Sequence, residues 1–132
     1  MPPTIPASHA DLLDAPYATL ATVDRAGRPQ LSQVAFLAED GTVRISLNTS
    51  RRKTQHLMRN PAVNVLIVDP QNPFRYLELS GAAALEADED GTFVARAGAK
   101  YGQDFTVYDQ EGEVRVIATV RPSRVYAADL SG

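Results

Sequence analysis

The chain has 132 residues, of which 44% are hydrophobic and 22% charged, and its formal net charge at pH 7 is −3. These values predict one globular domain, residues 1–132, long enough to bury a core. The acidic balance disfavours a nucleic-acid-binding function, and the absence of cysteine excludes disulfides, thiol nucleophiles and cysteine-ligated metals. No stretch approaches the roughly 18 apolar residues of a membrane span, and no signal-peptide pattern opens the chain, so we expect a cytoplasmic protein without membrane contact.

The first third of the chain predicts a short helix followed by a β-hairpin. Residues 1–7 are proline-rich and are expected to be loose, and Ser8 is the predicted N-cap of the helix that follows. The β-branched residues of "YATLATVD" (17–24) predict a strand, and "QLSQVAFLA" (30–38) predicts its hairpin partner across the "RAGRP" turn.

A tight turn then leads into a strand with clear alternation. The stretch "EDG" (39–41) carries the Asp-Gly signal of a two-residue hairpin. In "TVRISLN" (42–48) every second residue is apolar, so one face is expected to be buried and the other exposed. The inward residues are Val43, Ile45 and Leu47, and the outward residues are Arg44, Ser46 and Asn48.

Two further strands are predicted in the middle of the chain. The segment "AVNVLIVD" (62–69) is almost continuously apolar, which predicts a strand covered on both faces. The segment "FRYLELSGAAALEA" (74–87) predicts a long strand with a bend or bulge at Gly81.

The last third of the chain predicts a helix and a C-terminal strand. Residues 88–102 can hold a helix, although Gly98 weakens it, and residues 113–129 predict a strand, a break at Pro122 and a short strand after it. Six or seven antiparallel strands with two or three short helices predict a mainly β protein, either a closed or a split β-barrel.

The helix predicted for "NTSRRKTQHLMRNP" (48–61) begins with three cations. The partial positive charge of a helix N-terminus disfavours basic residues in the first turn, and one alone would be a tolerated surface charge. Three in succession, preceded by two hydroxyl residues, predict a site where backbone N–H groups, hydroxyls and cations converge on a phosphate. The candidate ligands are Arg51 and Lys53 first and Arg52 third, behind the N-cap candidates Asn48, Thr49 and Ser50.

Helix geometry predicts which side chains of this helix pack against the protein. One stripe is expected to face the core, and it consists of Thr54, Leu57, Met58 and Pro61. The opposite face is expected to meet solvent, with Arg52, Gln55 and Arg59. No Gly-x-x-x-x-Gly-Lys loop is present, so the phosphate site does not indicate a nucleoside triphosphatase.

Three stretches, in this order, resemble the flavin-reductase-like split β-barrel family: "GRPQLSQVAF", "VRISLNTSRRKTQHLMRNPAVNVLIVD" and "YLELSGAAAL". The family includes pyridoxamine 5′-phosphate oxidase and the oxidoreductases that use the deazaflavin F420. The resemblance covers nearly the whole chain, about residues 12–128. It implies an FMN-binding-like split barrel and a homodimer with two cofactor sites at the subunit interface, in which the basic helix start holds the cofactor phosphate.

The resemblance also implies further cofactor contacts. The strand "PQLSQV" (29–34) would line the ring, which assigns Pro29, Gln30, Ser32 and Gln33 to the site. In this interpretation Asn48 and Thr49 touch the region between ribityl chain and phosphate. Phe74 and Tyr76 would close the site from the other subunit. The alternative for these strand residues is ordinary packing or hydrogen bonding within the sheet.

Two cofactors remain open at this point. The pair Arg52-Lys53 matches the pyridoxamine oxidase branch of the family, whereas Arg51-x-Lys53 matches the F420 branch. The C-terminal Arg and His residues and the W-x-L-x-P type ending of pyridoxamine oxidases are absent, which disfavours a role in vitamin B6 synthesis.

The resulting prediction is an F420H2-dependent oxidoreductase that transfers a hydride between F420 and a small organic substrate. The alternatives are an FMN-dependent oxidase or reductase, and a non-catalytic protein that binds F420, FMN or haem. No catalytic side chain is predicted, because no nucleophile-elbow signature accompanies the serines. The two histidines lie too far apart in sequence to indicate a metal site. His56 is expected to support the site or lie on the surface, and His9 to be uninvolved.

Overall fold

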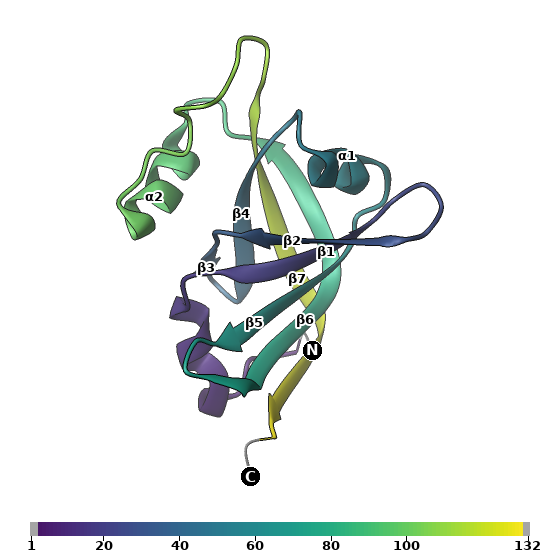
Figure 1. Ribbon diagram of the computed structural model, residues 1–132, viewed down its shortest axis with the longest axis vertical. Helices are drawn as coiled ribbons and strands as arrows, with labels where there is room; N and C mark the ends of the chain where they lie inside the picture. The colour runs from purple at the N-terminus through teal and green to yellow at the C-terminus, as the bar shows by residue number, and fades with distance from the viewer. Residues whose placement is uncertain (1–2, 131–132) are drawn as a thin grey trace.

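Seven antiparallel strands form the single sheet of the computed structural model, which describes residues 3–130 (Figure 1). The strand order is β2-β1-β5-β6-β7-β4-β3. Figure 1 shows β4 and β7 running along the long axis of the molecule, while β1 and β2 cross in front of them. The mainly β, split-barrel fold predicted from the sequence is confirmed.

The elements follow the chain with short connections. The strands are β1 (Ala18–Val23), β2 (Pro29–Val34), β3 (Leu37–Glu39), β4 (Thr42–Asn48), β5 (Ala62–Asp69), β6 (Asn72–Ala87) and β7 (Arg115–Asp129). The described helices are the 3-10 helix η1 (Ala7–Asp14) and the α-helices α1 (Arg52–Arg59) and α2 (Thr92–Tyr101). Of the segment predicted to be loose, residues 1–2 lie outside the described part, and residues 3–6 have no regular secondary structure.

The segment predicted as one strand, residues 30–38, is in fact two strands at opposite edges of the sheet. β2 pairs with β1, whereas β3 pairs with β4. The chain leaves β2 at Ala35 and is anchored by Phe36, which is completely buried. The ammonium group of Lys100 lies 3.9 Å from the centre of the Phe36 ring and donates a hydrogen bond to the Phe36 carbonyl. This crossing lets one short stretch contribute to both edges of the barrel.

Burial follows the predicted alternation on β4 but covers only one face of β5. The predicted core residues of β4, Val43, Ile45 and Leu47, are 1–3% exposed. On β5 alternate side chains are buried, but Ala62 and Asn64 are exposed. The prediction that β5 is covered on both faces is therefore wrong, because every second side chain from Ala62 to Val68 is exposed or only partly buried.

Gly81 lies where the long ladder between β6 and β7 shifts its register. Ser80 pairs with Arg124 and Gly81 pairs with Pro122, so Ser123 is the extra residue of a β-bulge. Proline is tolerated at a bulge because the ladder there does not need its missing N–H. β7 therefore continues through Pro122, and the predicted break into two strands is wrong, whereas the bulge at Gly81 is confirmed.

The variant Gly81→Ala should lower the free energy of unfolding by about 1–3 kcal/mol, the usual cost of overpacking. A Cβ at this position would lie 2.4 Å from the carbonyl oxygen of Arg121, a backbone atom held in the ladder. Urea denaturation of both proteins measures the difference. The variant Ala84→Val, at an exposed position of the same strand that does not pair with β5, is the control and should unfold like the wild type. Equal unfolding free energies for all three proteins would contradict the close contact.

The N-terminal helix is attached to the barrel by a histidine. η1 begins after Pro6 and has no side-chain cap, so the prediction of Ser8 as N-cap is wrong. The Ser8 hydroxyl instead lies 2.8 Å from Nδ1 of His9, and Nε2 of His9 lies 2.8 Å from the carbonyl oxygen of Ala128. His9 is only 6% exposed. It therefore connects η1 to the end of β7, a structural role that the sequence did not suggest.

The helices of the described chain do not include a membrane-spanning candidate. Within residues 3–130, none combines the length and apolar character needed to cross a bilayer. The same residues contain no cluster of His, Asp and Glu side chains that could hold a metal ion.

Candidate functional site

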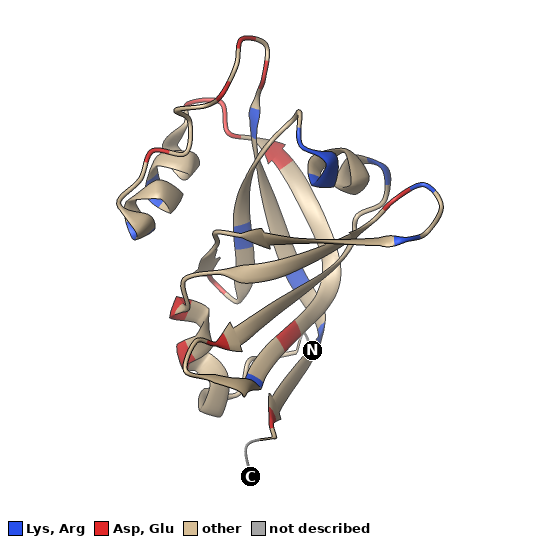
Figure 2. Ribbon diagram, viewed as in Figure 1, with Lys and Arg blue, Asp and Glu red and all other residues tan. Residues whose placement is uncertain are grey.

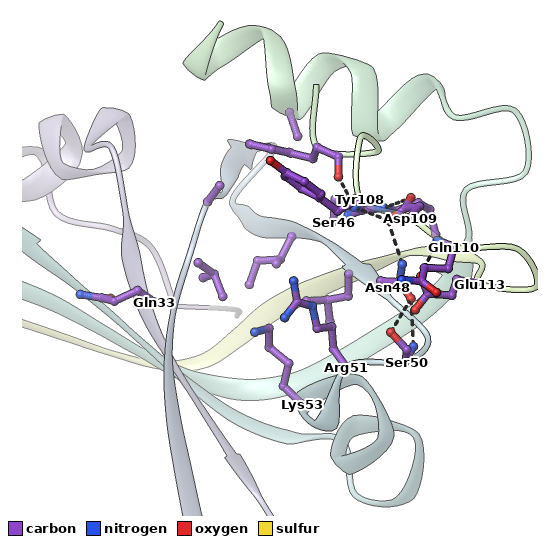
Figure 3. A pocket seen from close by; sticks show the side chains of 17 residues that line it. Gln33, Ser46, Asn48, Ser50, Arg51, Lys53, Tyr108, Asp109, Gln110 and Glu113 are labelled. Atoms are coloured by element: carbon purple, nitrogen blue, oxygen red, sulfur yellow. Dashed lines mark hydrogen bonds and ion pairs between the residues drawn. The ribbon is translucent and has the colours of Figure 1, made fainter. Parts of the chain in front are cut away.

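A cavity of about 610 Å³ opens between the start of α1 and residues 102–114, which join α2 to β7 and which we call the α2–β7 segment (Figure 3). This volume lies in the range of small-molecule sites, roughly 300–1,000 Å³. Its lining is mixed. Apolar side chains come from β2, β4 and the α2–β7 segment, among them Val34, Ile45 and Phe105. The polar side chains include Ser46, Asn48, Ser50, Arg51, Lys53, Asp109, Glu113 and Arg115.

The turn before α1 is shaped by Asn48. Its side-chain oxygen accepts hydrogen bonds from the Ser50 N–H at 2.9 Å and from the Ser50 hydroxyl at 3.0 Å. Its backbone carbonyl accepts bonds from the Arg51 N–H at 3.0 Å and from the Thr54 hydroxyl at 2.7 Å. These bonds explain why Asn48 is 6% exposed, although alternation placed it on the outer face. Asn48 therefore forms a turn of the Asx type before the helix rather than capping it.

The helix itself begins without a side-chain cap. Its N-cap residue is Arg51, whose side chain makes no capping hydrogen bond, so the prediction of Asn48, Thr49 or Ser50 as N-cap is wrong. The first N–H groups of an α-helix have no acceptor within the helix. In α1 these N–H groups lie at a terminus that carries partial positive charge, where they can donate hydrogen bonds to an anion.

Two cations without ion-pair partners extend from this terminus into the cavity. Figure 3 shows Arg51 and Lys53 side by side there, and within residues 3–130 neither makes an ion pair. Lys53 is half-buried. Burial lowers the pKa of the Lys53 ammonium, and the charge of Arg51 lowers it further. Both effects disfavour the charged form until an anion is present, so the arrangement suits a bound anion.

The third cation of the cavity, Arg115, is already paired. It donates from Nε to Asp109 Oδ2 and from Nη2 to Asp109 Oδ1, both at 2.8 Å. This pairing, together with a hydrogen bond from Asn48 and the charge of Arg51, holds the pKa of Asp109 below its usual range. Hydrogen bonding from Ser50 and from the backbone of Gln110 likewise lowers the pKa of Glu113. Among residues 3–130, the cations of the cavity that make no ion pair are therefore Arg51 and Lys53, and Glu113 adds a carboxylate to the same lining.

The affinity of this site for inorganic phosphate should fall as the pH rises. The fall should begin at a lower pH than it would if Lys53 had the usual lysine pKa of about 10.4. The reason is that the pKa of Lys53 is lowered, so the ammonium loses its proton as the pH rises through that lowered value. Calorimetric titration between neutral and alkaline pH measures the affinity. In the variant Lys53→Arg the cation stays protonated, so its affinity should hold over the same interval. A parallel decline in both proteins would contradict this role of Lys53.

The remaining basic and hydroxyl candidates lie beside the cavity. Thr49 does not line it: its N–H donates to the Val114 carbonyl at 3.0 Å, and its hydroxyl accepts from the Val114 N–H at 3.1 Å. Arg52 faces a separate depression of about 310 Å³ between α1 and the β1–β2 turn, with Arg25 and Arg59. Figure 2 shows basic residues, in blue, on the β1–β2 turn and on α1.

α1 is rotated relative to the predicted stripe. Thr54 and Leu57 are buried as predicted, but Met58 is 69% exposed and Pro61 is also exposed, so that part of the prediction is wrong. His56 takes their place at 5% exposure, and its Nδ1 lies 3.0 Å from the Thr22 hydroxyl on β1. His56 thus fixes the helix to the barrel on the side away from solvent.

Of the ring-contact candidates, the structure brings one to the cavity lining. Gln33 lines its edge, but Figure 3 shows its side chain directed away from Arg51 and Lys53, and it accepts a hydrogen bond from Thr19 at 2.8 Å. The others do not line this cavity: Pro29, Gln30 and Ser32 on β2, and Phe74 and Tyr76 on β6. Among the described residues, the buried side-chain oxygen of Gln30 has no hydrogen-bond donor.

Several lining residues were missed by reasoning from the sequence. Ser46 lies two positions before Asn48 on β4, so the strand period could have assigned it to the same face. Phe105, Tyr108, Asp109 and Arg115 come from a stretch without periodicity, and no local pattern places it beside α1.

Comparison with known proteins shows which proteins this chain resembles in sequence and fold. Residues 5–129 match the family described as pyridoxamine 5′-phosphate oxidase. Among solved structures, an F420 reductase is 33% identical over 92% of this chain and 98% of that chain, with a TM-score of 0.82. A candidate pyridoxamine 5′-phosphate oxidase from Listeria innocua is 25% identical over 89% and 92% of the two chains, with a TM-score of 0.69. A conserved hypothetical protein from Mycobacterium tuberculosis shares the fold at 22% identity, 96% and 86% coverage and a TM-score of 0.75. No curated protein matches the sequence.

Proposed function

Because the chain belongs to the pyridoxamine 5′-phosphate oxidase family, we propose that it is an oxidoreductase that binds the deazaflavin F420 at the start of α1. The reaction would be hydride transfer between F420 and a small organic substrate. The observation that carries this proposal is the pair of cations Arg51 and Lys53, which make no ion pair with any described residue and lie beside an uncapped helix terminus. Similarity to an F420 reductase supports the same cofactor.

The residues of the cavity fit a ligand with a phosphate at one end and a planar ring at the other. Arg51, Lys53 and the first-turn N–H groups of α1 would hold the phosphate, and Asn48 would keep the preceding turn in place. Apolar side chains such as Ile45 and Phe105 would exclude water from the ring. The bound cofactor supplies the hydride chemistry, and the protein binds, orients and shields it.

The direction of the basic side chains favours F420 over FMN. Arg51 and Lys53 both line the cavity, whereas Arg52 faces a different depression. The arrangement in use is therefore Arg-x-Lys, which the resemblance associates with the F420 branch, rather than the Arg-Lys pair of the flavin branch. FMN carries the same kind of phosphate and ring and is the competing cofactor.

Parallel fluorescence titrations of the purified protein with F420 and FMN test this function. Saturable binding of F420 with much weaker binding of FMN, followed by oxidation of F420H2 by a member of a substrate panel, is the expected result. Preference for FMN would replace the proposal with a flavin-dependent oxidase or reductase. Tight F420 binding without turnover of any substrate would indicate a carrier. Binding of neither cofactor would overturn the cofactor site.

We further propose that the protein works as a homodimer with the cofactor sites at the interface. The support is the outer face of the sheet, where β5 leaves Ala62 exposed and Leu66 and Val68 partly exposed beside the polar Asn64, and β2 leaves Leu31 68% exposed. An apolar strand face open to water is typical of a surface that another protein covers.

The variant Leu31→Glu should shift the protein from dimer to monomer, because a charge would be buried in the interface. Light scattering after gel filtration measures the mass, which should be twice the chain mass of 14.3 kDa for the wild type and 14.3 kDa for the variant. Leu130→Glu, at an equally apolar position that is 64% exposed near the C-terminus, is the control and should leave the dimer intact. A monomeric wild type would remove the proposal.

A further inference from the structure

Tyr108 borders the cavity without being held by the protein. It lies in the α2–β7 segment, lines the cavity and is 89% exposed (Figure 3). Its neighbour Val107 is 64% exposed. Within residues 3–130 no hydrogen bond or ring contact involves the Tyr108 side chain. A large aromatic ring in this position offers a free face to a ligand in the cavity.

The residues that follow Tyr108 are, by contrast, held by several hydrogen bonds. Asp109, the next residue, is held by two hydrogen bonds from Arg115 and by a third from Asn48 at 2.9 Å. The segment ends at Val114, which exchanges two hydrogen bonds with Thr49. Tyr108 therefore has a free side chain on a segment whose position depends on the residues before α1.

The Asn48 side chain is the direct link between the two sides of the cavity. Its oxygen accepts from the N–H and hydroxyl of Ser50, next to the phosphate-binding cations. Its nitrogen donates to Asp109, next to Tyr108. Asn48 is 6% exposed, so water cannot readily replace either set of bonds. Both sets of bonds are made by the same rigid side-chain amide. A shift of the Ser50 turn must therefore either move Asp109 as well or break the bond between Asn48 and Asp109.

We infer that Asn48 is a positioning residue that couples anion binding at the start of α1 to the placement of Tyr108 over the cavity. The inference rests on the anion site of the proposed function but not on which cofactor binds there. An anion drawn in by Arg51 and Lys53 shifts the Ser50 turn, and the Asn48–Asp109 bond transmits that shift to the α2–β7 segment. The phosphate of a ligand thereby brings an aromatic ring against the rest of the same ligand.

The chain has no tryptophan, so Tyr108→Trp creates a single fluorescent reporter at this position. Inorganic phosphate is the probe, and calorimetry records its binding independently of the reporter. In Tyr108→Trp, bound phosphate should shift the tryptophan emission and reduce its quenching by acrylamide at least about twofold. When Asn48→Ala is added, phosphate should bind more weakly because the turn loses its support, and at saturating phosphate the tryptophan signal should no longer respond.

Three further proteins separate coupling from general damage to the fold. Asp109→Asn keeps an acceptor oxygen for Asn48 and should retain the response, whereas Asp109→Ala should lose it. A reporter at Tyr126→Trp, on β7 and outside the cavity lining, should not respond to phosphate in any background. The inference is overturned if phosphate binds to Tyr108→Trp without changing its tryptophan fluorescence. It is also overturned if the fluorescence change is the same after Asn48→Ala is added. Failure of phosphate to bind the wild type would overturn the anion site and the coupling together.

Discussion

Lys53→Ala should weaken cofactor binding about 10- to 100-fold, the loss expected when a charged hydrogen-bond donor to a phosphate, contributing roughly 1.5–3 kcal/mol, is removed. Lys53 is half-buried and makes no ion pair with any described residue. The free energy lost in the variant can therefore be assigned to the contact with the cofactor phosphate. Titration of the wild type and the variant with F420, followed by fluorescence, measures the ratio of dissociation constants. Arg51→Ala should have an effect of the same kind, and the double variant a larger one than either.

The fold of Lys53→Ala should remain intact, which separates a binding effect from a structural one. The pKa of Lys53 is lowered by burial, which means that its charged form is disfavoured in the folded protein. Removing it should leave the free energy of unfolding unchanged or slightly higher. Arg124→Ala removes an exposed cation of β7 and should change neither quantity. Unaltered cofactor affinity in Lys53→Ala would contradict the assignment of the phosphate site.

The part of the fold that could be predicted is the part set by local pattern. The alternation of Val43, Ile45 and Leu47 identified the buried face of β4, and the turn before it needs the positive φ angles of Asp40 and Gly41, 51° and 76°. Both signals lie within a few residues of sequence. The division of residues 30–38 into β2 and β3 could not be predicted in this way, because the two halves pair with strands on opposite edges of the sheet.

The orientation of α1 shows a second limit of periodicity. Eight residues make only about two turns, so an apolar stripe is defined by two or three side chains and its direction is poorly determined. A polar residue, His56, is buried because Thr22 on β1 provides a hydrogen-bond partner, and Met58 is exposed in its place. Such a partner, 34 residues away in the chain, leaves no trace in the sequence of the helix.

The same contrast divides the candidate site. Arg51 and Lys53 could be recognised because misplaced charge at a helix start is a local feature with a physical cost. Asp109 and Arg115 could not be recognised as site residues, because the contact that brings them to the cavity joins Asn48 to a residue 61 positions later. The side of the cavity formed by the α2–β7 segment thus depends on long-range polar contacts, which a short sequence pattern does not encode.

Those contacts should make Arg115→Met one of the most destabilising single changes in the chain, at about 3 kcal/mol. This is the lower end of the cost of breaking a buried ion pair, because the side chains of Arg115 and Asp109 keep 16% and 24% exposure. The change leaves the Asp109 carboxylate without its main partner and also removes the donor to the Phe105 carbonyl. Urea denaturation at neutral pH measures the loss, and Arg124→Met, an exposed position on the same strand, is the matched control.

The pH dependence of this loss identifies its cause. In the wild type the pKa of Asp109 is lowered by Arg115, so the ion pair stabilises the fold above the unfolded carboxyl pKa of about 3.9. That stabilisation is lost as the pH falls through the lowered value, because the carboxyl becomes protonated. The difference in unfolding free energy between wild type and Arg115→Met should therefore shrink below about pH 4. A difference that stays constant down to pH 3 would mean that Arg115 stabilises the protein through packing of its side chain and not through its charge.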